Sequence, residues 1–255
     1  MFEIFLSIVP IVFFYMVLWF GVSIILKRND VVDIAWGLGF VFVAFSVFYN
    51  NLSLINCLIF MMVFFWGTRL SLHIFLRNTK KDEDYRYKKW REEWGKYFYV
   101  RSFFQVYMLQ GFLMICISSG FILISSLSNF EPALWQIILG GALWLKGFFF
   151  EAVGDAQLTR FIKNPANAGK IMTGGLWKYT RHPNYFGEIA MWWGIWIFTI
   201  DTPIMWVALI SPVTITFLLL KISGIPLLEK KYDGNVEFQE YKKRTSALFP
   251  LPPKV

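Results

Sequence analysis

Apolar residues fill seven long stretches of this chain, and most charged residues lie in the short links between them. A helix needs about 20 mostly apolar residues to cross a bilayer. The pattern therefore predicts an all-α, polytopic integral membrane protein with about seven transmembrane helices. The sixth stretch is short, and we expect it to tilt or to cross only in part. The stretches run over residues 3–26, 31–49, 53–76, 102–127, 133–157, 184–200 and 203–223.

Composition supports this class. Hydrophobic residues make up 56% of the chain and charged residues 16%, with a mean hydropathy of +0.50, whereas soluble domains carry roughly 25% charged residues. The first apolar stretch lacks the basic region and the small-residue cleavage site of a signal peptide, so we expect it to be retained as a span. No internal repeat or separable soluble domain is visible, which predicts a single transmembrane domain over residues 1–255.

The net charge of +8 would suit a nucleic-acid partner, but its distribution does not. Lys and Arg gather in alternate links, such as Lys27-Arg28 and the segment NTKKDEDYRYKKWREEWGKYF, whereas Asn50-Asn51 and the link after residue 200 carry no base. The positive-inside rule then predicts an N-terminus outside and a C-terminus in the cytoplasm. We expect no nucleic-acid partner.

Metal chemistry also finds no support in the sequence. The two cysteines, Cys57 and Cys116, lie far apart inside apolar stretches and are expected to pack as small apolar residues. His73 and His182 are the only histidines, and neither has another ligand at metal-binding spacing. We therefore expect no metal site.

Several polar residues lie inside the predicted spans, in or near their cytoplasmic halves. Ionisable groups are costly in hydrocarbon, so they are functional candidates by default. Residues four apart share one helix face, which pairs the polar residues on the third, fifth and sixth spans. The pattern predicts a pocket open to the cytoplasm; the alternative is a set of interhelical ion pairs. The group consists of Asp33, Arg69, His73, Glu151, Asp155, Asn184 and Glu188.

A basic, glycine-containing loop follows the fifth span. Lys163, Asn167 and Lys170 precede the segment MTGGLWKY. Backbone N–H groups and ammonium charges in such a loop can hold phosphates. The alternative is ordinary juxtamembrane positive charge, which supplies the same residues. The motif WGLGF contains GxG, but no full GxGxxG exists, so a Rossmann domain is not expected.

Several segments together resemble the steroid 5α-reductase superfamily, specifically its bacterial branch of small membrane proteins (DUF1295-like). The resemblance is carried by Asp155-x-Gln157, RFIKNPANAGKIMTGGLWKYTRHPNYFGE, GIPLLEKKY and FQEYKKRTSALFP. The segments DVVDIAWGLGF and Leu109-Gln-Gly111 look like the same family, so the similarity covers most of the chain. It implies a seven-helix fold whose cytoplasmic half wraps NADPH, in a bacterial inner membrane.

The resemblance also implies roles for individual residues. Acid or amide groups would hold polar atoms of the cofactor, lysines would lie near its phosphates, and an asparagine and an acid would engage it towards the nicotinamide. The predicted cofactor-binding residues are Arg69, His73, Glu151, Asp155, Lys163, Asn167, Lys170, Tyr179, Arg181, His182, Asn184, Glu188, Trp192, Glu229 and Tyr241.

The substrate side departs from the family pattern. Steroid-reducing members use a tyrosine on the third helix and a glutamate on the second to polarise the ketone. Here Trp66 replaces that tyrosine, and the second helix offers Asp33. The implied reaction is reduction of an activated C=C bond by NADPH, in a steroid-like or other lipid substrate drawn from the membrane. Its catalytic candidates are Asp33, Trp66 and Glu188.

Two other functions remain open. Methyltransferases of the isoprenylcysteine carboxyl type share an RHP-x-Y-x-G segment and use S-adenosylmethionine, although Glu188 and the stretch from Asp155 to GGLWKY favour the reductase. A non-catalytic lipid-binding or transport protein is the third alternative, which the lack of inverted repeats makes less attractive. The methyltransferase pattern would use Tyr179, Arg181, His182, Pro183, Tyr185, Gly187 and Glu229.

Overall fold

The computed structural model describes residues 2–79, 81–127 and 130–254, so Ser128 and Asn129 of the predicted link SLSNFEP lie outside the described residues. Helices dominate the described chain, which forms no strand and a single isolated bridge between Thr180 and Ser246. The all-α prediction is confirmed. The chain divides into two compact units, and each is described by itself below. That both units act as one domain stays a prediction.

Unit 1 comprises Met1–Pro132 and Thr202–Ile210. Its long helices form over apolar runs and begin or end where polar residues interrupt them, whereas α4 is strongly charged. Ser53, for example, accepts a hydrogen bond from the backbone of Asn56 and so caps a helix start. The helices are α1 (Phe2–Leu26), α2 (Val31–Asn50), α3 (Leu54–Asn78), α4 (Tyr85–Trp94), η1 (Gly95–Tyr97), α5 (Phe98–Ser102), η2 (Phe103–Met108), α6 (Leu109–Ser125) and α9 (Met205–Ala208).

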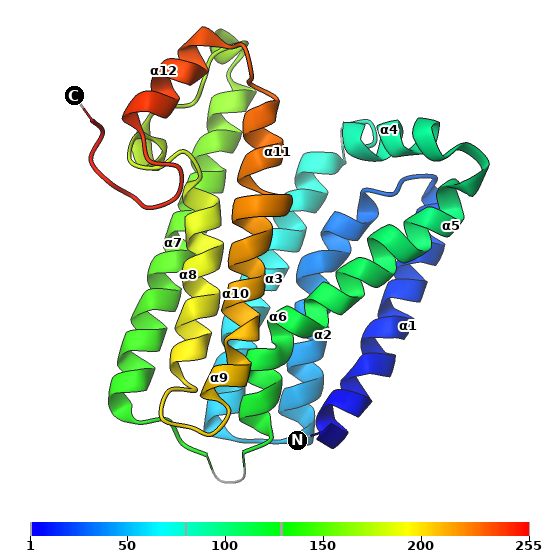
Figure 1. The fold of residues 1–255 in the computed structure, drawn as a ribbon, viewed down its shortest axis with the longest axis vertical. Helices are drawn as coiled ribbons and strands as arrows, with labels where there is room; N and C mark the ends of the chain where they lie inside the picture. Colours follow the sequence, from blue (N-terminus) through cyan, green and yellow to red (C-terminus); the bar gives the residue numbers. More distant parts are fainter. Residues whose placement is uncertain (1, 80, 128–129, 255) are drawn as a thin grey trace. The chain divides into compact units, whose positions relative to one another are not determined.

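Within unit 1, glycine allows α2 and α3 to approach closely (Figure 1). A Cβ atom at Gly37 would lie 2.5 Å from the carbonyl oxygen of Gly67, so no larger residue fits there without moving a backbone. The Ser71 hydroxyl donates to the carbonyl of Ile34 at 2.8 Å across the same pair. Small interfacial residues of this kind are typical of membrane helix packing.

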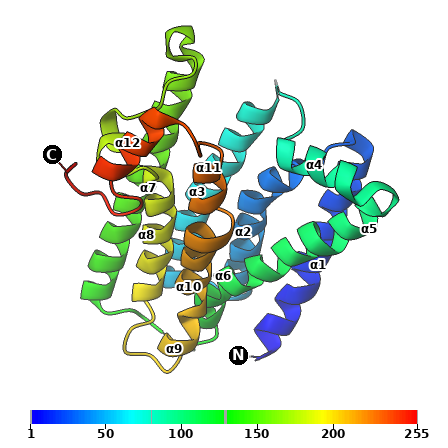
Figure 2. The same cartoon turned by 45° about the horizontal axis from the view of Figure 1, so that its top comes forward.

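Unit 2 comprises Ala133–Asp201 and Ser211–Val255. Its long helix α7 and the shorter α8 lie side by side in opposite directions, and α12 lies near the end of this pair where α8 begins (Figures 1 and 2). The helices are α7 (Leu134–Lys163), η3 (Pro165–Asn167), η4 (Gly175–Lys178), α8 (Pro183–Ile197), α10 (Ile210–Phe217) from its second residue on, η5 (Leu218–Ile222), α11 (Ile225–Lys230) and α12 (Val236–Arg244).

Glycines seven residues apart align the α7–α8 pair. On α7, a Cβ atom at Gly140 would lie 2.6 Å from the carbonyl oxygen of Gly194, and one at Gly147 would lie 2.5 Å from that of Gly187. Seven residues further along α7, Gly154 faces Pro183 at the start of α8. Because seven residues make nearly two helical turns, these glycines form a stripe along which the backbones touch.

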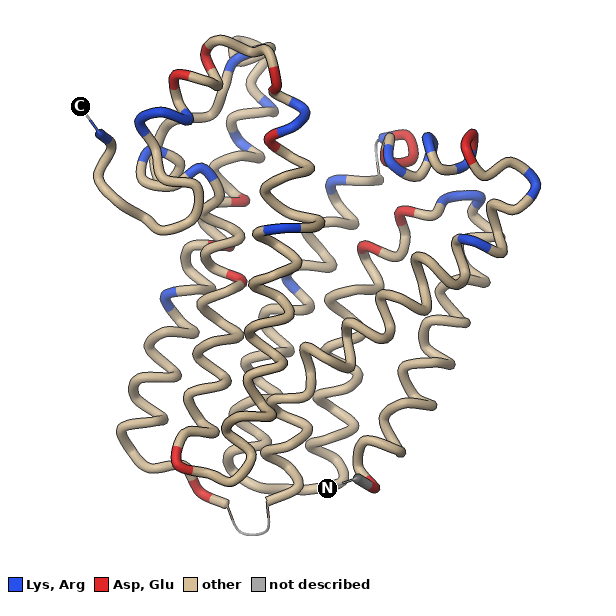
Figure 3. Tube along the Cα trace, in the orientation of Figure 1, with Lys and Arg blue, Asp and Glu red and all other residues tan. Residues whose placement is uncertain are grey.

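Within the described residues, six helical segments are long and apolar enough to cross a membrane. The predicted sixth span, α8, is not among them: its 15 residues reach only about 22 Å at 1.5 Å per residue, short of the roughly 30 Å hydrocarbon core. The prediction of about seven spans with a short sixth is therefore close. In each unit, most Lys and Arg residues gather towards one end of the helices (Figure 3). The direction of insertion stays a prediction.

Candidate functional site

Four polar side chains of α7 and α8 form what we call the acid–amide group: Glu151, Asp155, Asn184 and Glu188. Asn184 Nδ2 lies 3.3 Å from Asp155 Oδ1 and donates to it. Glu151, one turn before Asp155, is only 2% exposed. Glu188 lies one turn beyond Asn184 and is half-buried. Three carboxyl groups and an amide are thus concentrated between the last turns of α7 and the first turns of α8.

The glycine stripe makes this concentration possible. A Cβ atom at Gly187 would lie 2.6 Å from the backbone nitrogen of Glu151, so only glycine allows the two helices to meet at this level. Beyond Glu188, the predicted residue Trp192 is buried on α8. The acid, amide and tryptophan therefore lie where the backbones of α7 and α8 approach each other closely.

The loop between α7 and α8 folds back onto α7. The backbone N–H of Leu176 donates to Gln157 Oε1 at 2.9 Å, and Trp177 Nε1 donates to the carbonyl of Gly154 at 3.1 Å. Gly175 adopts a φ of 60°, and a Cβ atom there would lie 2.6 Å from the Gln157 amide. Gly175 thus serves a tight turn that only glycine accommodates, and phosphate binding by this loop stays a prediction.

An open cavity of about 450 Å³ lies between the end of α7 and this loop. Arg160 on α7 lines it together with Thr173 and Gly174 of the loop. Lys163 and Lys170, the lysines predicted to lie near phosphates, are exposed to solvent and follow Arg160 closely in the sequence. The side-chain amide of Asn167 already makes a local hydrogen bond, since its Nδ2 donates to the carbonyl of Phe161 at 3.0 Å. Sequence reasoning missed Arg160, although its position in the last basic turn of α7 could have indicated it.

An ionic cluster, buried except for Lys242, joins the start of α8 to α11 and α12, and we call it the Arg181 cluster: Arg181, His182, Glu229 and Lys242. Arg181 Nε and Nη2 lie 2.9 and 2.8 Å from Glu229 Oε1. Arg181 Nη1 donates to the carbonyls of Lys242 and Thr245. Lys242 Nζ lies 2.8 Å from Glu229 Oε2. Arg181 therefore joins the segment before α8 to Glu229 of α11 and to the end of α12. That Arg181 and Glu229 contact a cofactor stays a prediction.

His182 brings an unused acceptor to this cluster. Its Nε2 lies 3.2 Å from Glu229 Oε1. Because a carboxylate only accepts, the proton of a neutral imidazole belongs on Nε2. Burial lowers the pKa of His182, which favours that neutral form. Nδ1 is buried and has no hydrogen-bond partner among the residues that the structure describes. This lone pair can accept a hydrogen bond from a bound molecule.

The C-terminal segment is pinned to the loop before α8 (Figure 2). The backbone N–H of Arg181 donates to the carbonyl of Ser246 at 2.9 Å, and that of Leu251 donates to the carbonyl of Tyr179 at 3.0 Å. The Tyr241 hydroxyl donates to the carbonyl of Trp177. Tyr241 is thus buried with its hydroxyl in use, whereas the Tyr179 side chain is exposed.

Unit 1 holds the remaining predicted residues. Both carboxylate oxygens of Asp33 accept hydrogen bonds: Arg86 Nη2 lies 3.1 Å from Oδ2, and the Tyr87 hydroxyl lies 2.9 Å from Oδ1. Trp66 is 2% exposed and packs edge-to-face on Phe40. Sequence reasoning missed Arg86 and Tyr87, because they lie more than 50 residues from Asp33 in the chain.

Arg69 and His73 are half-buried on α3, four residues apart as expected. Contacts of Arg69 and His73 with the acids of α7 and α8 would lie between the two units, and these contacts stay a prediction. The structure does bring Asp155 to Asn184, and it brings His182 to Glu229.

Comparison with known proteins identifies a family. Residues 19–245 match the family described as "Protein of unknown function (DUF1295)". The curated protein "3-oxo-5-alpha-steroid 4-dehydrogenase 1" of Macaca fascicularis is 33% identical over 89 residues, covering 32% of this chain and 34% of that protein. Its Rattus norvegicus counterpart is 27% identical over 147 residues, covering 54% of this chain and 52% of that protein.

A plant protein gives a third similarity. "Steroid 5-alpha-reductase DET2" of Gossypium hirsutum is 33% identical over 66 residues, covering 26% of each chain. The matched stretches thus span from about a quarter to about half of these relatives' own lengths. A search of solved structures gives no significant match.

Proposed function

This chain belongs to the DUF1295 family and to the steroid 5α-reductase superfamily, and we propose that it is a membrane-embedded, NADPH-dependent reductase of a C=C bond in a lipid. The observation that carries the proposal is the contact of Asn184 with Asp155 across the glycine-packed pair of α7 and α8. Steroid-like lipids are the substrate class that the relatives' names suggest. The setting would be a bacterial inner membrane, with the site facing the cytoplasm.

The chemistry of unit 2 suits a dinucleotide. Carboxylate and amide oxygens of the acid–amide group accept hydrogen bonds, as ribose hydroxyls and a carboxamide require. The open Nδ1 of His182 offers one further acceptor. Arg160, Lys163 and Lys170 supply cations suited to phosphate oxygens. Acceptors and cations thus lie in different segments of the same unit, as a ligand with a sugar end and a phosphate end would need.

When bound, NADPH supplies the hydride for reduction of the double bond. The chain itself must orient the lipid and stabilise charge that develops on a conjugated carbonyl oxygen, which is usually a large part of catalysis. Asp33 is the predicted acid for that step. As it lies, Asp33 accepts hydrogen bonds from Arg86 and Tyr87. It can therefore donate a proton only after the Arg86 pair opens and a proton is bound.

The methyltransferase alternative relies on the Arg181 cluster. The nearly complete use of the Arg181 donors by Glu229 and two carbonyls disfavours direct binding of S-adenosylmethionine through that arginine. The unpaired Nδ1 of His182 is the feature of the cluster that leaves this alternative worth testing.

Binding to purified full-length protein in lipid nanodiscs tests the proposal. NADPH should raise the melting temperature, and S-adenosylmethionine should not. Asp155→Asn removes one charged acceptor and should weaken NADPH binding about tenfold or more, since hydrogen bonds to charged groups contribute about 1.5–3 kcal/mol. Asp233→Asn, at an exposed turn, is the matched control.

The outcomes separate the candidate functions. No NADPH binding by the wild-type protein, with lipid supplied, would refute the reductase. A shift with S-adenosylmethionine alone would favour the methyltransferase. Equal NADPH affinity in Asp155→Asn and the wild type would show that the acid–amide group is not the cofactor site.

A further inference from the structure

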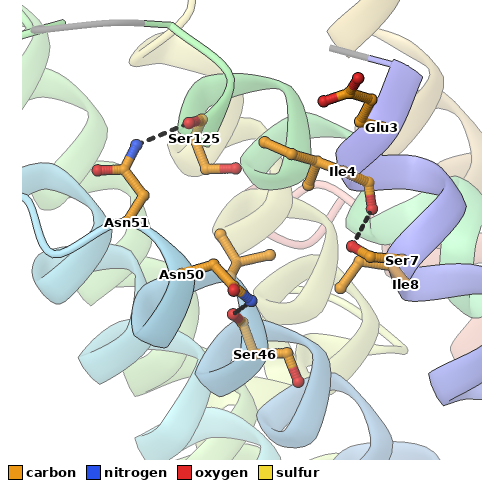
Figure 4. Close-up of a pocket in the computed structure, with 9 residues that line it drawn as sticks. Glu3, Ile4, Ser7, Ile8, Ser46, Asn50, Asn51 and Ser125 are labelled. Atoms are coloured by element: carbon orange, nitrogen blue, oxygen red, sulfur yellow. Dashed lines mark hydrogen bonds between the residues drawn. The ribbon is translucent and has the colours of Figure 1, made fainter.

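A second cavity lies in unit 1, where α1 begins and where α2 and α6 end (Figure 4). Its volume is about 200 Å³. Asn50, which lines it, is 17 positions beyond Asp33 on the same helix, or about 25 Å at 1.5 Å per residue. The cavity is therefore separate from the Asp33 end of α2 and belongs to none of the groups described above.

The serines of this cavity have already used their protons. Ser7, Ser46 and Ser125 each donate a hydroxyl hydrogen bond to a carbonyl three or four residues earlier in their own helix, at 2.7, 2.9 and 2.7 Å. A hydroxyl has one proton and two lone pairs. Each serine oxygen can therefore only accept a further hydrogen bond.

The two asparagines of the lining also donate hydrogen bonds to backbone carbonyls. Asn50 Nδ2 donates to the carbonyl of Ser46, and Asn51 Nδ2 donates to the carbonyl of Ser125, both at 2.7 Å. The second contact joins the link after α2 to the end of α6 (Figure 4). The amide oxygens of both residues still have acceptor capacity. Each amide nitrogen keeps one further N–H, so the polar lining offers more acceptors than donors.

The charge of the lining has the same sign. Glu3 contributes a carboxylate from the first turn of α1, and none of the described residues that line the cavity is basic. The C-terminal ends of α2 and α6 also meet here, and the last carbonyls of a helix carry partial negative charge. One helix N-terminus, that of α1, partly offsets these charges. The balance favours a cation that can donate several hydrogen bonds.

The volume of the cavity and the types of side chain that line it limit which cations it can bind. A volume of about 200 Å³ is below the roughly 300–1,000 Å³ of sites for drug-sized ligands. Hard divalent cations prefer several carboxylates, and the described residues contain no cluster of three metal-binding side chains. Apolar walls from Ile4, Ile8 and Val47 suit methylene groups beside the charge. We propose that this cavity binds a primary ammonium group, such as that of ethanolamine.

The position suggests where such a group would come from. Helices α1 and α2 and the segment Tyr85–Ser125, which ends in α6, are apolar enough to span a membrane, and the cavity lies at their ends, where lipid head groups would lie. Phosphatidylethanolamine carries a primary ammonium group at that depth, and free ethanolammonium carries the same group in water. Phosphatidylcholine is a stringent comparison, because its quaternary ammonium has the same charge but no N–H donor.

Native mass spectrometry of the full-length protein tests the site by counting bound dioleoyl-phosphatidylethanolamine and dioleoyl-phosphatidylcholine at matched concentrations. The wild type should bind the ethanolamine lipid at least about tenfold more tightly, as expected for hydrogen bonds to a charged donor. Glu3→Gln should abolish that preference. Glu131→Gln, which removes an exposed acid outside the cavity lining, should retain it.

A second variant and a competitor complete the test. Ser46→Leu fills the cavity without changing charge and should also abolish the preference. Displacement by ethanolammonium chloride would assign the site to the ammonium group from either source, and lack of displacement would assign it to the lipid. Equal binding of both lipids by the wild type, or a preference retained in a folded Glu3→Gln variant, would overturn the proposal.

Discussion

Gly147→Ala should separate the α7–α8 pair at its centre. The added Cβ atom would lie 2.5 Å from the carbonyl oxygen of Gly187, about 0.9 Å short of the 3.4 Å at which ordinary contact begins. Two backbone atoms of α8 lie within 2.9 Å of it, so no rotation of a side chain relieves the clash. Overpacking of this kind costs about 1–3 kcal/mol, while replacing a helical glycine returns at most about 1 kcal/mol.

The net loss of up to about 2 kcal/mol should lower the melting temperature by up to roughly 8 °C for a chain of this size. The assay is thermal unfolding of the purified protein in one detergent, followed by tryptophan fluorescence. Gly141→Ala is the matched control on the same helix, because a Cβ atom there meets nothing within 4 Å, and it should melt at or above the wild-type temperature. The reasoning is wrong if Gly147→Ala melts like Gly141→Ala.

Two further predictions concern the Arg181 cluster. Glu229→Gln leaves the buried guanidinium of Arg181 without its anion and should destabilise the protein by about 3 kcal/mol. The control variant, Glu237→Gln on the exposed face of α12, should melt at the wild-type temperature. Equal melting temperatures of the two variants would contradict a structural role for Glu229. Burial lowers the pKa of His182 in the folded state, so as the pH falls below the unfolded-state value of about 6.5 the unfolded chain binds a proton first and stability is lost. His182→Gln should therefore lose less stability between pH 7.5 and pH 5.5 than the wild type does, and an unchanged slope in thermal melts would count against this assignment.

Sequence periodicity located the acid–amide group well. The spacing of Asn184 and Glu188, four residues apart at the start of the sixth span, indicated one helix face turned towards Asp155. The pocket expected around these residues stays a prediction, whereas within unit 2 Asn184 is hydrogen-bonded to Asp155. The reason is that both residues lie on regular helices joined by a single loop, where local geometry largely decides which faces meet.

The Arg181 cluster shows the opposite case. Sequence reasoning assigned Arg181, His182 and Glu229 to a cofactor because they lie in recognisable segments. The structure pairs Arg181 with Glu229 across 48 positions of the chain and gives most of its remaining donors to backbone carbonyls. Lys242, which completes the cluster, carried no signal in the sequence beyond its basic charge. Charge alone does not say which distant groups will share a buried volume.

The sequence by itself determined the class of this protein, the positions of its membrane helices, the shortness of α8 and its family, because hydrophobic length and helical spacing are local properties of a chain. Only the tertiary structure decided which polar groups are already satisfied. Asp33 accepts hydrogen bonds from Arg86 and Tyr87, and Arg181 is paired with Glu229. Nδ1 of His182 has no hydrogen-bond partner among the described residues. These differences arise when helices pack and remove polar groups from water, because each buried donor or acceptor must then find a partner within the fold or in a bound ligand.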